Sequence, residues 1–171
     1  DLESFGYLVK PFAHDKDAIQ ALVLFAEVAA YYKSQGKTFA DGLQELFEKF
    51  GYFEEKTISL DFPGIHGNDE MSAIISKFRN EQPKTIGGVA VNRVQDFSTA
   101  TETSADGQQK TLPQPKANVL KYWLADGSWV AVRPSGTEPK LKFYIGVESD
   151  SQATSQAKID VISEDLMRFA K

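Results

Sequence analysis

The chain has 171 residues, of which 42% are hydrophobic and 25% are charged, and this composition suits one folded domain or one domain with part of another. Its net charge of −5 argues against a general nucleic-acid-binding protein, which would be expected to show a basic excess. The absence of cysteine excludes disulfides and cysteine-based zinc sites, and the two histidines, His14 and His66, are too far apart to suggest a histidine-rich metal site.

Two helices are expected within residues 1–51. Asp15 is a suitable N-cap for the first helix, and Gly36 supplies a left-handed stop. The second begins at Thr38, where Asp41 makes a partial capping box. The first helix is apolar on nearly every side, which is typical of an interior helix. We therefore expect residues 1–51 either to self-associate with a neighbouring copy or to be poorly ordered.

Residues 54–171 show a different pattern, in which strands dominate. Alternating apolar residues and turn signals predict the order β-α-β-β-β-β-α, an antiparallel sheet with helices on one face, and hence an α+β fold. Asn68 is the expected cap of the first helix in this region, and Asp126-Gly127 a hairpin turn. The polar stretch 98–116 is expected to be a long hairpin loop.

One loop carries the residue types that bind an anion. In the stretch VRPSGTEPKLKF, Arg133 ends a strand and can hold two phosphate oxygens through its planar guanidinium. Ser135 and Thr137 offer hydroxyl donors, and Gly136 allows close backbone approach and a positive φ, so that successive amides could form an anion-binding nest. These residues predict a phosphate site.

The same pattern has a simpler interpretation. Ser-Gly between two strands is often only a turn, and an arginine beside it commonly pairs with a carboxylate such as Glu138. Lys140 and Lys142 add local positive charge to an otherwise acidic chain. Composition does not decide between a turn and a phosphate site.

Two stretches resemble the α-D-phosphohexomutases, the phosphoglucomutase and phosphomannomutase family. VRPSGTEPKLKFYI resembles the phosphate-binding loop of that family's last domain, and ESFGYLVKPFAHDKDAIQA resembles the sugar-recognition loop and following helix of its third domain. The resemblance implies that residues 54–171 are the fourth, C-terminal domain with a TATA-binding-protein-like fold. It also implies that residues 1–51 are a two-helix remnant of the third, α/β domain. The chain begins without methionine, and we expect it to be cut from a longer enzyme.

The resemblance implies an enzyme that interconverts hexose 1-phosphate and hexose 6-phosphate, with glucose or mannose as the sugar. In that family a phosphoserine in domain one donates the phosphoryl group, and three aspartates in domain two bind Mg²⁺. Neither element occurs in this sequence. We therefore expect no catalytic residue and no metal ligand in this chain, which should be inactive without domains 1–3. The expected protein is cytoplasmic, with a phosphosugar substrate, no nucleic acid and no membrane partner.

The family's binding residues can be carried over position by position. One set of family residues holds the phosphate that is not being transferred, and the positions that match it are Arg133, Ser135, Gly136 and Thr137. Glu3 and Ser4 match part of the loop that recognises the sugar hydroxyls. Lys16 matches a lysine that reaches towards phosphate. Leu2 stands where the family has a glutamate, and this departure weakens Glu3 and Ser4 as sugar contacts. His14 stands where an arginine is common.

A different class of function remains open on the residues alone. The chain could be a non-enzymatic protein-interaction module whose sheet face or apolar helices meet a partner. Trp123 and Trp129 alternate with other residues in predicted strands, which favours packing on the sheet over stacking on a sugar.

Overall fold

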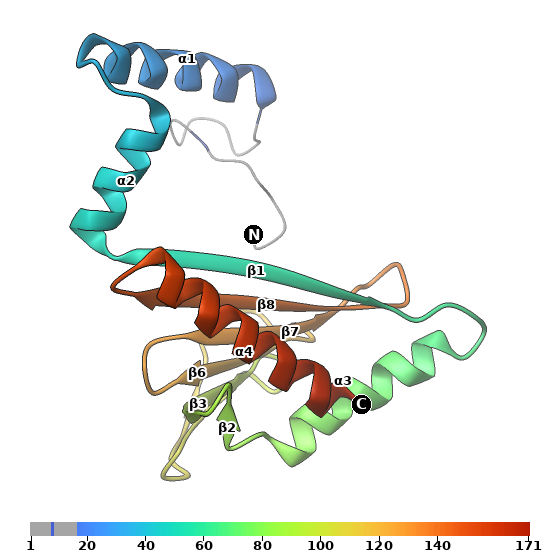
Figure 1. Ribbon diagram of the computed structural model, residues 1–171. Helices are drawn as coiled ribbons and strands as arrows, with labels where there is room; N and C mark the ends of the chain where they lie inside the picture. Colours follow the sequence, from blue (N-terminus) through green and yellow to red (C-terminus); the bar gives the residue numbers. More distant parts are fainter. Residues whose placement is uncertain (1–7, 9–16) are drawn as a thin grey trace. The chain divides into compact units, whose positions relative to one another are not determined.

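The computed structural model describes residue 8 and residues 17–171, and the chain divides into two compact units, residues 1–51 and 52–171 (Figure 1). In the described part of the first unit the helices are α1 (Ala18–Ser34) and α2 (Phe39–Phe50). The cap of α1 is Asp17, whose carboxylate accepts hydrogen bonds from the amides of Ile19 and Gln20. The predicted cap, Asp15, lies outside the described residues.

Local sequence signals account for the ends of both helices. Gly36 has a φ of +72°, as its predicted role as a helix stop requires. At the start of α2, Thr38 and Asp41 form a full capping box, which confirms that prediction. Helix α1 buries none of its residues. An apolar hollow of about 360 Å³ is lined by Val28, Tyr32, Phe39, Ala40, Gly42, Leu43 and Leu46.

The second unit is an antiparallel sheet with two helices. Its strands are β1 (Tyr52–Asp61), β2 (Thr85–Ile86), β3 (Val89–Asp96), β4 (Thr101–Ser104), β5 (Gln109–Thr111), β6 (Leu120–Leu124), β7 (Trp129–Pro134) and β8 (Lys140–Ser149), and its helices are α3 (Gly67–Glu81) and α4 (Gln152–Ala170). The strand order is β1-β8-β7-β6-β3-β4-β5, and β2 pairs with β3. Every pairing is antiparallel. The expected mixed fold with an antiparallel sheet is thus confirmed.

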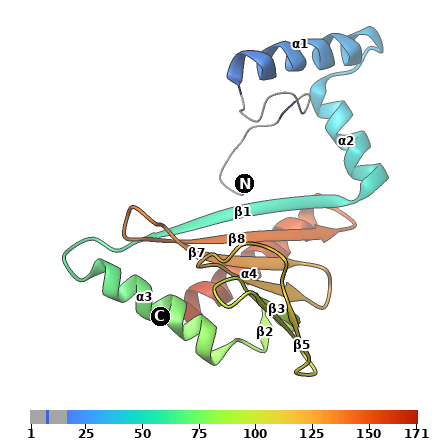
Figure 2. The ribbon, with the colours of Figure 1, turned by 180° about the vertical axis from the view of Figure 1, so that it is seen from behind.

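Both helices of this unit pack on the same face of the sheet, because their buried residues belong to one core cluster. Helix α4 crosses in front of the sheet in Figure 1 and behind it in Figure 2. The fully buried aromatic residue Phe78 of α3 lies at the centre of the core, with ring centroids 5.5 Å from Phe143 and 4.6 Å from Phe169. The Tyr122 hydroxyl donates to the Phe78 carbonyl oxygen at 2.9 Å. Burial of this kind supplies most of the favourable free energy of folding.

The strands alternate between this core face and a second face. Val130 and Val132 of β7 belong to the core, so Trp129 and Arg133 point to the second face. The registers of β6, β7 and β8 therefore place Lys121, Trp123 and Lys142 on the second face as well.

Two predictions of local structure were wrong. Helix α3 begins at Gly67, and its N-cap position is His66, which makes no side-chain capping bond, whereas Asn68 was expected there. The stretch 98–116 is not a plain loop, because it contains β4 and β5, which extend the sheet beyond β3. These strands are short and polar, so they lack the apolar alternation by which strands are recognised in a sequence.

Candidate functional site

The Arg133 loop, residues 133–139, joins the neighbouring strands β7 and β8. Arg133 is half-buried at the end of β7, while Gly136, Thr137 and Glu138 are exposed. The loop is closed by its own backbone, since the Ser135 amide donates to the Lys140 carbonyl oxygen at 2.8 Å. The segment is therefore a compact turn at the end of a well-packed strand pair.

The Ser135 hydroxyl organises the turn. Its oxygen accepts hydrogen bonds from the amides of Thr137 and Glu138, each at 3.4 Å. Two amides thus converge on one oxygen, and the hydroxyl hydrogen is left to donate elsewhere. The two amides are satisfied within the turn, so the donor that Ser135 can offer to a ligand is its hydroxyl hydrogen.

The conformation of Gly136 differs from the prediction. Its φ does not lie in the left-handed region, so the loop does not form the predicted nest by that route. A Cβ atom at Gly136 would also meet no atom within 4 Å. Neither the backbone nor the packing within the chain requires glycine at this position. What the missing side chain provides is open space beside Ser135 and Thr137.

Positive charge is concentrated around the loop. Arg133 and Lys142 are direct cross-strand partners on the second face, an arrangement of like charges that favours an anion nearby. Both residues also make interactions within the chain. Lys140 is paired with Glu138 at 3.2 Å and with Asp61 at 3.5 Å.

The second face continues away from the loop as a stack of cations and indoles. The Lys121 ammonium lies 4.1 Å from the Trp123 ring centroid and 4.2 Å from that of Trp129, and the Arg93 guanidinium lies 4.7 Å from Trp123. A Cβ atom at Gly146 would lie 2.4 Å from the Trp129 ring, so that indole rests directly on the backbone. These contacts agree with the interpretation of both tryptophans as packing residues.

A polar network that the sequence did not reveal lies at the edge of this face. The carboxylate of Glu102 on β4 is almost fully buried, and it accepts hydrogen bonds from Lys110 at 2.9 Å and from Gln95. Gln95 in turn accepts from the Trp123 indole at 3.1 Å. The hydrogen bond from Lys110 is the main cause that lowers the pKa of Glu102, against the opposing effect of burial.

The lowered pKa of Glu102 makes part of the stability dependent on pH. A carboxyl whose pKa is lower in the folded state stabilises the fold above its ordinary pKa, and this contribution is lost as the pH falls through the folded value. Between about pH 6 and pH 3, Glu102→Gln should therefore lose less stability than the wild type. Urea unfolding at several pH values measures this. Lys110→Met should also make the free energy of unfolding less dependent on pH in this range. Identical pH dependence in the wild type, Glu102→Gln and Lys110→Met would contradict the role assigned to Glu102.

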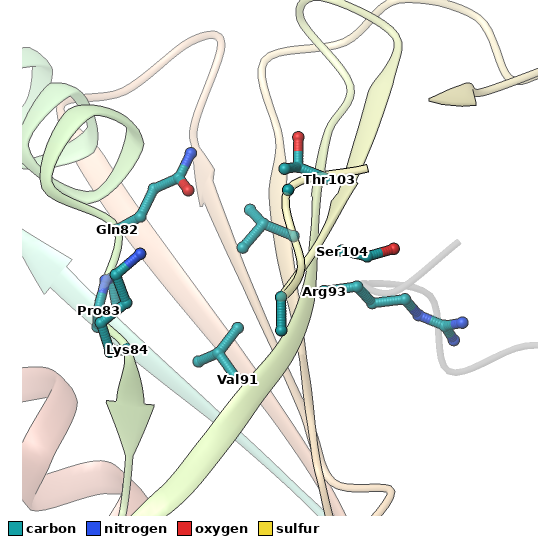
Figure 3. A pocket seen from close by; sticks show the side chains of 10 residues that line it. Gln82, Pro83, Lys84, Val91, Arg93, Thr103 and Ser104 are labelled. Carbon is teal, nitrogen blue, oxygen red and sulfur yellow. The ribbon is translucent and has the colours of Figure 1, made fainter. Parts of the chain in front are cut away.

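A small pocket of about 170 Å³ lies beside β3, between the segment after α3 and β4 (Figure 3). Figure 3 shows Gln82, Pro83 and Lys84 on one side and Val91 and Thr103 on the other, with the Arg93 guanidinium pointing away. Gln82 has a φ of +40°, which is unusual for a residue other than glycine. This pocket shares no residue with the Arg133 loop.

The structure brings together only part of the predicted site. Arg133, Ser135, Gly136 and Thr137 lie in one turn. The other predicted contacts, Glu3, Ser4 and Lys16, lie outside the described residues, as do Leu2 and His14. His66 is exposed, and its Nδ1 atom lies 3.9 Å from Asp69.

No group of three or more His, Asp or Glu side chains within residues 17–171 or at residue 8 could hold a metal ion. Across the same part of the chain, no helix has the length and apolar character needed to span a membrane.

Comparison with known proteins identifies relatives that match most of the chain. Residues 77–159, which include the Arg133 loop, match the family model described as phosphoglucomutase/phosphomannomutase, C-terminal domain. The chain is 38% identical to a phosphoglucomutase of Staphylococcus epidermidis over 149 residues, which are 86% of this chain and 27% of the relative. It is 34% identical to a phosphoglucomutase of Staphylococcus haemolyticus over 168 residues, which are 98% of this chain and 29% of the relative.

A solved structure supports the fold. The open form of pp63/parafusin, a phosphoglucomutase from Paramecium, matches with a TM-score of 0.59 and 18% identity over 98% of this chain and 29% of that chain. The chain thus spans between a quarter and a third of the length of the relatives it matches. On these matches, the chain belongs to the phosphoglucomutase/phosphomannomutase family, and it corresponds to the C-terminal part of that family's members.

Proposed function

We propose that the Arg133 loop binds the phosphate group of a hexose phosphate, as part of an enzyme that interconverts hexose 1-phosphate and hexose 6-phosphate. The observation that carries this proposal is the turn itself. It combines a half-buried arginine, a serine oxygen on which two amides converge, and a glycine that the fold does not require. In this role the loop is a handle that orients the sugar for chemistry elsewhere.

The family assignment supports the rest of the proposal. Residues 54–171 would be the fourth domain, with a TATA-binding-protein-like fold, and residues 1–51 the end of the third. Mg²⁺ and the phosphoryl donor would be bound by other domains, as the family resemblance implies. The chain by itself would then bind substrate without turning it over. Self-association through residues 1–51 stays a prediction.

The direct test is a calorimetric titration of the 171-residue chain with glucose 6-phosphate and, as a matched control, glucose. Three or four charge-assisted contacts of about 1.5–3 kcal/mol each would give affinity in the micromolar range. Inorganic phosphate should compete, and glucose should not bind. Equal heats for both sugars would reject the proposal and favour the alternative, a protein-interaction module.

Gly136→Ala tests the open space beside the turn. The φ of Gly136 and the empty surroundings of its Cβ position allow alanine without strain, so the unfolding midpoint should not fall. The added methyl group should crowd the ligand and weaken glucose 6-phosphate binding by about tenfold. Unchanged affinity in this variant would show that the ligand does not approach Gly136.

A further inference from the structure

We propose that Lys140 is a positioning residue of the phosphate site: its ammonium group binds Glu138 and Asp61 and so holds the Glu138 carboxylate away from the bound anion. This inference rests on the proposed function and adds a second requirement to it. The Arg133 loop carries an acidic residue of its own, Glu138. If the loop binds phosphate, the negative charge of Glu138 must be neutralised or held away from the anion.

The geometry places Lys140 between two carboxylates. Its Nζ atom lies 3.2 Å from Glu138 in the loop and 3.5 Å from Asp61 at the end of β1. Asp61 is the cross-strand partner of Lys140, so the register of β1 and β8 fixes one side of this arrangement. The adjoining backbone strengthens it, since the Phe62 amide donates to the Pro139 carbonyl oxygen at 2.9 Å.

Lys140 also closes the loop through its main chain. Its amide donates to the Glu138 carbonyl oxygen, and its carbonyl oxygen accepts from the Ser135 amide, both at 2.8 Å. The residue that controls the Glu138 side chain is thus the one that determines where the turn ends. The hydrogen bond that Lys140 donates to Glu138, followed by the charges of Glu138 and Asp61, raises the pKa of Lys140, so the ammonium form is the one that persists.

Electrostatics explain why this arrangement matters for binding. The Glu138 amide points at Ser135, so its carboxylate belongs to the same turn that is proposed to hold the phosphate. One unpaired negative charge several ångströms from the anion, at the dielectric of a protein surface, would weaken binding by roughly twofold to tenfold. Lys140 is not itself a strong candidate for a phosphate contact, because its ammonium already lies between two carboxylates.

A double-mutant cycle tests the inference, with inorganic phosphate and glucose 6-phosphate as the probes. Lys140→Met should weaken binding of both by about fivefold. Glu138→Gln should bind at least as well as the wild type, and the double variant should bind within about twofold of Glu138→Gln. Raising the salt to about 0.5 M should reduce the effect of Lys140→Met relative to the wild type. A purely structural role would predict neither the rescue nor the salt dependence.

Lys56→Met is the matched control. Lys56 lies on β1 and pairs with Asp160 of α4 at 3.6 Å, so this variant removes the same charge from the core side of the sheet. It should bind phosphate within about twofold of the wild type. If Lys140→Met weakens phosphate binding equally in the wild type and in the Glu138→Gln variant, Lys140 contacts the phosphate directly. If it weakens binding in neither, Lys140 has no role in binding. Either result overturns the inference.

Failure of the proposed function would give a different pattern. In that case the wild type binds neither probe, and the amide resonances of Ser135 to Glu138 become the measurement. Lys140→Met and Glu138→Gln should then shift the same amides in the absence of any ligand, because both variants remove the same ion pair. If these amide resonances do not shift in either variant, the ion pair does not position the turn, and the role of Lys140 is rejected independently of phosphate binding.

Discussion

Replacing Arg133 by alanine is expected to weaken glucose 6-phosphate binding by at least about a hundredfold, which corresponds to the loss of two charge-assisted hydrogen bonds. The guanidinium is the one group in the turn with a permanent charge and a planar pair of donors. It lies on the second face of the sheet, opposite the core, so its removal leaves the packing of Val132 and Leu141 intact. Titration calorimetry with glucose 6-phosphate measures the loss.

Arg133→Lys separates charge from geometry in this experiment. Lysine keeps the positive charge but presents a single ammonium, so binding should be intermediate between the wild type and the alanine variant. Arg168→Ala is the control, because Arg168 is an exposed arginine near the end of α4 that pairs only weakly with Asp165 at 3.6 Å. Wild-type affinity in Arg133→Ala would remove the basis of the proposed function.

Much of the sheet could be predicted because its signals are local. The alternation of apolar residues in β6, β7 and β8 matches the side of the sheet that each residue faces, and Asp126-Gly127 forms the predicted turn between β6 and β7. The start of α3 was misplaced because His66 occupies the N-cap position without a side-chain bond. A cap that makes no bond leaves no signal in the sequence.

The candidate site was only partly accessible to sequence reasoning. The residues proposed to bind the anion are adjacent in the chain, so a motif of a few letters predicts them. The partners of Lys140 and Glu102 are set by register instead, since Asp61 lies on another strand and Lys110 on a strand that was not predicted. The position of the Ser135 hydroxyl, which accepts from two amides of the turn, likewise depends on how the turn closes onto Lys140. Contacts of this kind follow from tertiary pairing, which a single sequence does not specify.

Phe78→Ala should destabilise the second unit by about 4 kcal/mol, the largest effect on stability expected in this chain. The ring is fully buried, and it contacts aromatic rings from three different elements: Tyr122 of β6, Phe143 of β8 and Phe169 of α4. Alanine would leave a cavity that these rings cannot fill together, because each is held by its own strand or helix. Urea unfolding followed by tryptophan fluorescence reports on this unit, since Trp123 and Trp129 both lie in its sheet.

Phe53→Ala is the matched control, because Phe53 lies on β1 of the same unit with 51% of its surface exposed. Its loss should cost less than about 1 kcal/mol. The comparison also bears on the proposed phosphate site. Val132 and Leu141, which flank the Arg133 loop, belong to the same buried cluster as Phe78, so loosening that cluster should weaken phosphate binding without altering any residue of the turn. Equal unfolding midpoints for Phe78→Ala and Phe53→Ala would show that the Phe78 ring is not central to the core. The conformation of the Arg133 loop would then depend on the hydrogen bonds within its own turn and not on the buried cluster.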